Sequence, residues 1–416
     1  MVAKPLKPWI WQRPEWPEFY WDSARLALPL ANARRSQGEL IGMARLLDPD
    51  SDLRAQLEVL TSDGVATSAI EGERLDPNAV RSSLARRLGL PSVGLPAPPR
   101  SVEGLVDVLI DATKRLDKPL TVKMLGDWQA SLFPTGRSGL TKIRVGQLRG
   151  TTPMQIVSGP IGKQRVYYEA PPRSRLEREL KRFVQWFNAP PADLDGLLRA
   201  GVAHAWFELI HPFEDGNGRV GRALLDRALA QDEDRSVRLY SLSARFMAVR
   251  NEYYDALQAL SRGTLDATDL LRWFLNQIVA ACADSAQTVE RVLAKTRFWM
   301  RHGQSRLNVR QQKALNALLD AGPRGFVGGM TNKKYAHLTR VSPATAQRDL
   351  AELAARGVLK AQGAGRSVRY ELPDRRFSRH VGAFDSVAVD TDCRFCISSA
   401  SIAARVMRHS MRLGVP

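Results

Sequence analysis

The sequence predicts a mainly α-helical protein that also contains a short β-hairpin and a C-terminal winged helix-turn-helix. Apolar residues recur at helical spacing through 23–60, 101–135 and 174–285. Residues 141–172 are instead rich in β-branched side chains with Gly and Pro breaks, as is typical of a hairpin. Residues 308–372 combine three helical segments with two short strand-like ones. A chain of 416 residues has room for about two to four domains.

The N-terminal segment is dense in tryptophan and proline. Residues 7–22 are KPWIWQRPEWPEFYWD, and prolines at this density oppose a regular helix, so we expect an extended segment anchored by its aromatic side chains. Residues 65–88 predict two helices separated by a break at Asp76-Pro77. The Pro-rich stretch PSVGLPAPPR (91–100) indicates a linker. We therefore predict an N-terminal helical domain over 1–90 and a second helical domain over 101–285.

Beyond residue 285 we predict a helical linker (286–307), a winged helix-turn-helix (308–375) and a loosely ordered tail (376–416). In VSPATAQRDLAELAARG, Ser342 suits the N-cap position, Pro343 the first helical position and Gly357 the helix end. The segments VLK and SVRYEL then predict two strands joined by the turn QGAGR, which would form the wing.

Positive charge is concentrated in this C-terminal module. The chain carries a formal charge of +18, and residues 301–375 hold 14 Lys or Arg against 5 Asp or Glu, which is +9. Such a module favours an acidic partner such as DNA, although a generally basic composition or a protein-contact role would give the same pattern. If it binds DNA, the residues expected to contact the major groove are Thr345, Gln347 and Arg348, with Arg366 on the backbone.

The composition excludes other classes of protein. Three cysteines cannot support a disulfide scaffold, and the single pair Cys393 and Cys396 lacks the second pair of a structural zinc site. No apolar run approaches the ~18 residues of a membrane span, so we expect no membrane partner. The N-terminus shows no apolar signal-peptide core, and we expect a cytoplasmic protein.

The strongest chemical signal is HPFEDGNGRVGR, from His211 to Arg222, which lies between two predicted helices. Its glycines let a ligand approach the backbone at a helix N-terminus, where amide groups favour an anion. Arg219 and Arg222 share one helix face and can hold a polyphosphate, while Asp215 offers an oxygen ligand for Mg²⁺. His211 can accept a proton from an attacking hydroxyl. A plain turn with solvent-facing arginines is the alternative, which the number of coincident features disfavours.

This motif resembles the signature HPFx(D/E)GNGRxxR of the Fic (filamentation induced by cAMP) family, and the resemblance extends over about 60–285. The segment WIWQRPEWPEFYWD is similar to a small N-terminal domain of some bacterial members. The resemblance implies transfer of AMP from ATP to a protein hydroxyl, with Mg²⁺ as cofactor. His211 would be the general base and Asp215 the metal ligand. The residues that it assigns to the phosphates are Gly216, Asn217, Gly218, Arg219 and Arg222.

The resemblance also assigns roles outside the motif. The hairpin would be the family's flap, with the target docked on 150–170 as an added strand. Val157, Ser158 and Gly159 would lie near the nucleotide, and Tyr254 could pack on the adenine. A plain surface hairpin and a core tyrosine are the alternatives.

A second motif indicates a built-in brake. Thr67 to Gly72, TSAIEG, fits the family's inhibitory pattern (S/T)xxxE(G/N). The resemblance implies that Glu71 pairs with Arg222 and takes the place that the γ-phosphate needs. An exposed glutamate before a glycine break is the alternative.

The function that the sequence predicts is therefore an autoinhibited protein adenylyltransferase. The main alternative is a nucleotide-sensing, DNA-binding regulator with little transferase activity, and the intact His211 favours the enzyme. Relatives that transfer phosphocholine, UMP or phosphate leave the transferred group as a further alternative. Members of the family frequently form homodimers, so a second copy of the chain is a candidate partner.

Overall fold

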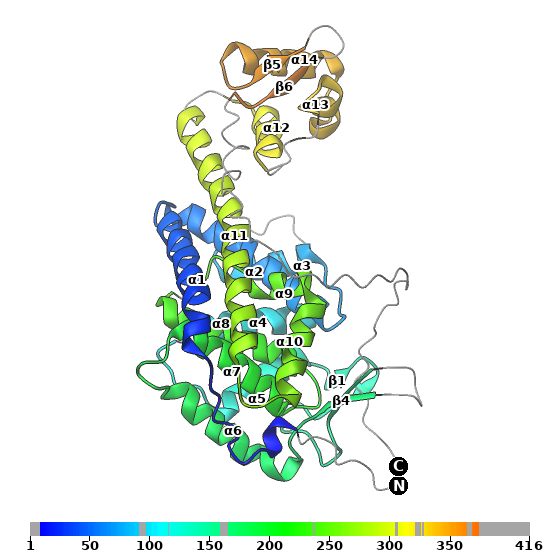
Figure 1. The fold of residues 1–416 in the computed structure, drawn as a ribbon. Coiled ribbons are helices and arrows are strands. Elements are labelled where there is room, and N and C mark those ends of the chain that lie inside the picture. The colour runs from blue at the N-terminus through cyan, green and yellow to red at the C-terminus, as the bar shows by residue number, and fades with distance from the viewer. Residues whose placement is uncertain are drawn as a thin grey trace, which may run out of the picture. The chain divides into compact units, whose positions relative to one another are not determined.

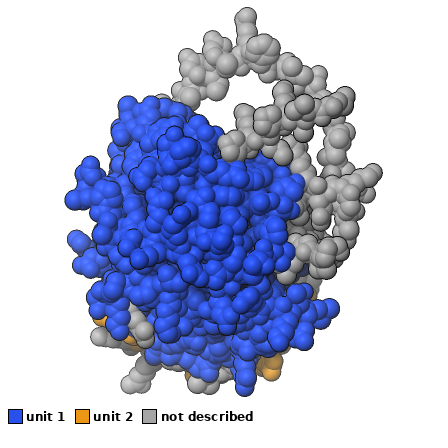
Figure 2. Space-filling model, turned by 90° about the horizontal axis from the view of Figure 1, so that it is seen from below, with its two compact units in different colours: residues 1–45, 52–285, 406–416 blue, residues 46–51, 286–405 orange. Residues whose placement is uncertain are grey.

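The computed structural model describes residues 9–90, 97–114, 116–158, 165–235, 238–303, 307–320, 326, 328–363 and 368–373. These residues fall into two compact units, drawn in separate colours in Figure 2. The first unit comprises 9–45 and 52–285, and the second comprises 46–51 and 286–373. The predicted mainly helical class with small hairpins is confirmed, as Figure 1 shows.

The first unit contains most of the described helices and two short antiparallel strand pairs. In chain order its elements are the 3-10 turn η1 (Ile10–Gln12), α1 (Ser23–Ala44), α2 (Pro49–Ile70), α3 (Pro77–Arg87), α4 (Arg100–Lys114), α5 (Val122–Leu132), β1 (Arg137–Ser138), β2 (Thr141–Lys142), β3 (Gln155–Ser158), β4 (Arg165–Glu169), α6 (Arg173–Asn188), α7 (Gly196–Ile210), α8 (Asn217–Glu233), α9 (Leu242–Ala248), α10 (Arg250–Arg262) and α11 (Thr268–His302). The first residues of α2 and the last of α11 belong to the second unit.

The centre of the first unit is α7, which is apolar around its whole circumference. Twelve of its fifteen residues are buried, as expected for a helix enclosed by others. It packs against α8, which in turn contacts α4 and α5. The motif loop between α7 and α8 therefore starts and ends on the most firmly packed elements of this unit.

The hairpin predicted within 141–172 is present as β3 and β4, which pair in antiparallel register with a bulge between Ile156 and Val157. A smaller antiparallel pair, β1 and β2, precedes it. Gly159 lies outside the described residues, as do Arg366, the cysteines at 393 and 396, and the predicted tail.

The N-terminal aromatic segment packs onto the helical core. Trp11 and Trp16 are buried, and the Trp16 indole donates to the carboxylate of Glu179 in α6 at 2.9 Å. Tyr20 forms a backbone bridge with the strand-like residue Asp266 before α11. The segment predicted to be aromatic-anchored is thus held by α6 and by the start of α11.

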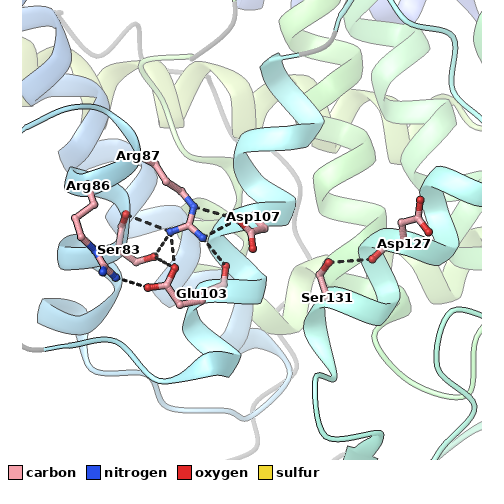
Figure 3. A network of polar contacts seen from close by, with 7 residues as sticks. All are labelled: Ser83, Arg86, Arg87, Glu103, Asp107, Asp127 and Ser131. Atoms are coloured by element: carbon pink, nitrogen blue, oxygen red, sulfur yellow. Dashed lines mark hydrogen bonds and ion pairs between the residues drawn. The ribbon is translucent and has the colours of Figure 1, made fainter.

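A polar network joins α3 to α4 (Figure 3). Arg86 and Arg87 both pair with Glu103, and Arg87 also reaches Asp107 at 2.6 Å. Buried apolar side chains of α2, α3 and α4 also form one cluster. The predicted break at Asp76-Pro77 is where α3 begins, with the Asp76 side chain capping it. The helices of 1–90 and those of 101–285 therefore share a core within one unit.

The second unit contains α12 (Val309–Asp320), α13 (Asn332–Thr339), α14 (Pro343–Ala355), β5 (Lys360–Gln362) and β6 (Arg369–Glu371). Strands β5 and β6 pair in antiparallel register, and Met330 bridges to Tyr370. Ser342 caps α14 by accepting from the amide of Thr345. The elements follow the order expected of the module at 308–372, and its identity as a winged helix stays a prediction.

Candidate active site

The loop from His211 to Gly216 joins α7 to α8 and is shaped by its own residues. His211 ends α7 in a left-handed conformation with φ of 48°. The Asn217 side chain accepts from the Phe213 amide and donates to the Phe213 carbonyl, both at 2.8 Å. Gly216 has φ of 86°, and a Cβ atom there would lie 2.8 Å from the Phe133 ring. Asn217 is expected at the phosphates, and in the structure its side-chain oxygen and nitrogen bridge the backbone of Phe213 and so close this loop.

The imidazole of His211 is buried and has one unused nitrogen. Its Nδ1 lies 3.3 Å from the Glu208 carbonyl oxygen, and because a carbonyl only accepts, Nδ1 carries the proton. Nε2 has no hydrogen-bond partner among the described residues. Burial, and secondarily the positive charge of Arg149, lower the pKa of His211 to about 4. The ring is therefore neutral at pH 7 and presents an Nε2 lone pair that can accept a proton.

Arg222 is buried, and its guanidinium is hydrogen-bonded to the end of α2. Its Nε donates to the Thr67 hydroxyl at 2.7 Å, and its Nη2 donates to the Thr67 carbonyl at 3.0 Å and to Glu71 Oε1 at 2.7 Å. Burial alone would raise the pKa of Glu71, but the adjacent Arg222 guanidinium holds it below its ordinary value. The predicted pairing of Glu71 with Arg222 is thus present as a charged, hydrogen-bonded contact.

The Glu71 carboxylate lies directly on the first turn of α8. A Cβ atom added at Gly218 would be only 2.1 Å from Glu71 Oε1. The N-terminus of a helix favours negative charge through its free amides and dipole. Glu71 consequently occupies the position where the motif would bind an anion.

Arg219 pairs with a second glutamate that the sequence analysis missed. Its Nη1 lies 3.0 Å from Glu73 Oε2, and its guanidinium stacks over the Phe133 ring at 4.9 Å. Glu73 is two residues beyond Glu71, outside the inhibitory pattern, so only its acidic character close to that pattern could have indicated it. Both arginines of the motif therefore contact carboxylates that follow α2.

Asp215 is the candidate metal ligand. Its carboxylate accepts from the Gly216 amide at 2.6 Å and from the Ser138 hydroxyl. The described residues contain no group of three or more His, Cys, Asp or Glu side chains placed to hold a metal. Mg²⁺ bound beside phosphates commonly takes only one or two carboxylates, with substrate oxygens and water as its other ligands. Asp215 fits that type of site, and Ser138, which the sequence analysis also missed, orients it.

The roles of three further predicted residues stay predictions. Val157 and Ser158 are in β3. Tyr254 of α10 is linked to the end of α2, because its hydroxyl donates to the Ile70 carbonyl at 3.3 Å. Ile70 directly precedes Glu71, so Tyr254 helps to hold the backbone next to Glu71.

Another acid, Glu208, lies one helical turn before His211. Burial raises its pKa to about 8, and Oε1 has no hydrogen-bond partner among the described residues. The positive charge of Arg222 opposes this rise, while Glu71 adds to it. At neutral pH Glu208 is mostly protonated, so it does not compete with Glu71 for Arg222 as a full negative charge.

Comparison with known proteins identifies two regions of the chain. Residues 119–229 match the Fic/DOC family, and residues 9–90 match a domain of unknown function, DUF4172. The chain carries a Fic domain. This domain contains the motif loop, the hairpin and Asp215, whereas Thr67 and Glu71 come from the DUF4172 region.

Named relatives match only part of this chain. A probable protein adenylyltransferase of Aquifex aeolicus is 31% identical over 99 residues, which are 23% of this chain and 31% of that protein. Protein adenylyltransferase fic-1 of Caenorhabditis elegans is 35% identical over 88 residues, which are 21% of this chain and 16% of that protein. The match thus spans less than a third of either relative.

Among solved structures, a Fic family protein from Desulfovibrio desulfuricans G20 aligns with a TM-score of 0.49 and 19% identity, over 83% of this chain and 95% of that one. A Fic domain-containing signalling protein from Bacteroides thetaiotaomicron aligns with a TM-score of 0.48 and 15% identity, over 62% of this chain and 97% of that one. No helix in the described part of the chain is long and apolar enough to cross a membrane.

Proposed function

We propose that the protein is an adenylyltransferase that transfers AMP from ATP to a hydroxyl side chain of a target protein, and that Glu71 holds it inactive. The observation that carries this proposal is the neutral, buried imidazole of His211, whose free Nε2 lies at a loop leading into the two arginines of α8. A nucleotide sensor needs no proton acceptor at this position. The names of the two partial relatives agree with the transferred group.

In the proposed reaction, His211 Nε2 takes the proton of the target hydroxyl as its oxygen attacks the α-phosphorus. The bond from that phosphorus to the oxygen bridging to the β-phosphate breaks, and pyrophosphate leaves with the electron pair. Arg219 and Arg222 bind the departing phosphates, and the amides of the first turn of α8 face the α-phosphate. Mg²⁺, held by Asp215, would neutralise phosphate charge. The target segment would extend along 150–170 beside the hairpin.

The brake follows from the same contacts. As long as Glu71 pairs with Arg222 on the first turn of α8, the γ-phosphate cannot use that guanidinium, and the nucleotide lacks the alignment that in-line attack requires. Removing one partner of a largely buried ion pair typically costs several kcal/mol of stability, because the other charge is left without a partner. Release of Glu71 is therefore the proposed route to activation.

The test is transfer of label from α-labelled ATP with Mg²⁺ onto protein by wild type, Glu71→Gly, Glu71→Gln and the double variant Glu71→Gly with His211→Ala. We expect Glu71→Gly to label at least about tenfold faster than wild type, and the labelling rate of Glu71→Gln to lie between the two. The double variant should label about 10²–10⁴-fold more slowly than Glu71→Gly, because it lacks the proton acceptor. Label from γ-labelled ATP instead would identify phosphate as the transferred group. ATP binding without any labelling in all variants would refute the transferase and favour the nucleotide-sensing regulator.

We also propose that the second unit binds duplex DNA. Lys333 of α13 and Gln347 and Arg348 of α14 are exposed, and Thr345 is half-buried beside them. The carboxylates of Asp349, Glu352 and Glu371 are each paired with an arginine. The exposed charge left on α13 and α14 is therefore positive, which favours a polyanionic partner.

A further inference from the structure

A buried arginine, Arg149, is not used by the proposed mechanism and lacks an acidic partner. Its side chain is only 2% exposed, and it forms no ion pair with any carboxylate that the structure describes. Burying a guanidinium without a counter-charge costs several kcal/mol unless its donors are satisfied. Its contacts should therefore show what it does.

Among the described residues, the acceptors of the Arg149 side chain are backbone carbonyls of two segments. Nε donates to the His211 carbonyl at 2.9 Å, and Nη2 donates to the carbonyl of Pro171. The backbone amide of Arg149 also donates to the Pro212 carbonyl at 3.0 Å. Pro171 lies between the end of β4 and the start of α6, whereas His211 and Pro212 begin the motif loop.

The contact at His211 bears on the orientation of the imidazole. A non-glycine residue with positive φ is held there by its surroundings, because the left-handed conformation is costly for it. Arg149 holds the carbonyl of His211, and the backbone amide of His211 donates to the Phe207 carbonyl at 3.0 Å. The direction of the His211 side chain is set between these two bonds.

The contact at Pro171 bears on the hairpin. Strand β4 is also tied to α7, since the Tyr168 hydroxyl donates to the Leu209 carbonyl at 2.6 Å. Arg149 thus adds a second tie at the exit of the same strand. A shift of β4 relative to α7 would have to break one of the two guanidinium bonds.

On this geometry, and resting on the proposed transferase function, we propose that Arg149 is a positioning residue that couples the hairpin to the catalytic histidine, so that a target strand docked on the hairpin is presented to a correctly directed imidazole. The positive charge of Arg149 also favours a proton-accepting imidazole, because it lowers the pKa of His211 and so helps to keep the ring neutral. The other charged groups that act on His211 are Glu71 at the end of α2 and Asp215 in the loop. Tyr168, Glu169 and Arg173 act on Arg149 itself.

The test compares Arg149→Met and Arg149→Lys, both in the Glu71→Gly background. Arg173→Met is the matched control, since Arg173 is a neighbouring arginine whose guanidinium pairs with Glu177 at the surface. Two readouts are taken: the ATP dependence of self-labelling with α-labelled ATP, and amide hydrogen exchange of 165–171 and 211–213.

For Arg149→Met we expect kcat to fall about 10²-fold with KM for ATP within about twofold, since misplacement of a catalytic group by about 1 Å has an effect of that size. Exchange should accelerate in both segments together. Arg149→Lys retains one donating nitrogen, so its kcat and its exchange rates should lie between those of Arg149→Met and the parent. Arg173→Met should match the parent in both readouts. A change of KM alone, or faster exchange in only one segment, would overturn the coupling. Absence of label in the Glu71→Gly parent would refute the transferase itself, while the exchange result would still decide whether Arg149 couples the two segments.

Discussion

At the residue scale, the chemistry of His211 depends on which ring nitrogen carries the proton. The Glu208 carbonyl fixes the proton on Nδ1, and burial together with the positive charge of Arg149 disfavours a second proton. Nε2 is therefore a free base over the whole physiological pH range. An unperturbed histidine, with its pKa of about 6.5, would lose this property in mildly acidic solution.

This difference predicts the pH dependence of transfer. In Glu71→Gly, kcat/KM for ATP should change less than about twofold between pH 8 and pH 6, because a pKa lowered to about 4 leaves the free enzyme's histidine deprotonated throughout. Loss of Glu71 lowers the pKa further, since its negative charge favours the protonated ring. Initial rates in buffers of constant ionic strength check this. A fall in rate with a midpoint near 6.5 would contradict the assigned environment.

The sequence indicated residues that belong to recognisable motifs and missed residues that act on them from elsewhere in the fold. Glu71 and Arg222, 151 residues apart, could be paired in advance because both lie in motifs that resemble those of the Fic family, and the resemblance implies the pairing. Glu73, Ser138 and Arg149 could not, since their partners lie 146, 77 and 62 residues away. The use of the Asn217 side chain to close its own loop was missed because its position in the motif suggested a ligand.

At the element scale, the contacts that we propose to be inhibitory depend on how α2 ends. Thr67 and Glu71 are four residues apart and so reach Arg222 from the same side of the last turn. The carbonyl of Ile70 is held by Arg250 at 2.5 Å and by the Tyr254 hydroxyl, both from α10. Movement of α10 is thus a route by which the end of α2 could be released.

The next element-scale prediction concerns Glu73, which follows the same helix end. Glu73→Gln should tighten ATP binding and raise labelling, but by no more than about fivefold, because the Glu73 side chain is 41% exposed and such pairs are worth about 1 kcal/mol or less. Equilibrium ATP binding to wild type, Glu73→Gln, Glu71→Gly and the double variant checks it. The matched control is Glu58→Gln on α2, whose partner Arg81 lies outside the site. Equal affinity in Glu73→Gln and wild type would show that this ion pair does not compete with the nucleotide.

At the scale of the whole molecule, the residues around Arg222 do not all come from the Fic domain. Residues 9–90 supply Thr67 and Glu71, and share the apolar cluster of α2, α3 and α4 with the start of the next region. The helical class and the hairpin followed from local periodicity. The packing of Trp11 and Trp16 onto the core did not, because a dense aromatic segment indicates burial without indicating the surface that buries it.

The last whole-molecule prediction is that the full chain binds duplex DNA through its second unit. Retention of wild type on a random-sequence duplex should weaken steeply as salt rises from 50 to 200 mM, because each phosphate contact releases counterions. Lys333→Glu combined with Arg348→Glu should abolish retention at the higher salt. It should also reduce the slope of log affinity against log salt by the amount expected for about two phosphate contacts.

The matched control changes the same net charge at Lys313 of α12 and Lys123 of α5, both exposed, and should keep most of the binding. Because Gln347 and Thr345 sit beside Arg348 on the first turns of α14, Gln347→Ala should leave nonspecific retention and its salt slope unchanged. Binding that ignores salt, or equal loss in the control, would mean that the exposed charge of α13 and α14 is not a DNA surface. A protein partner would then be the better explanation of the module.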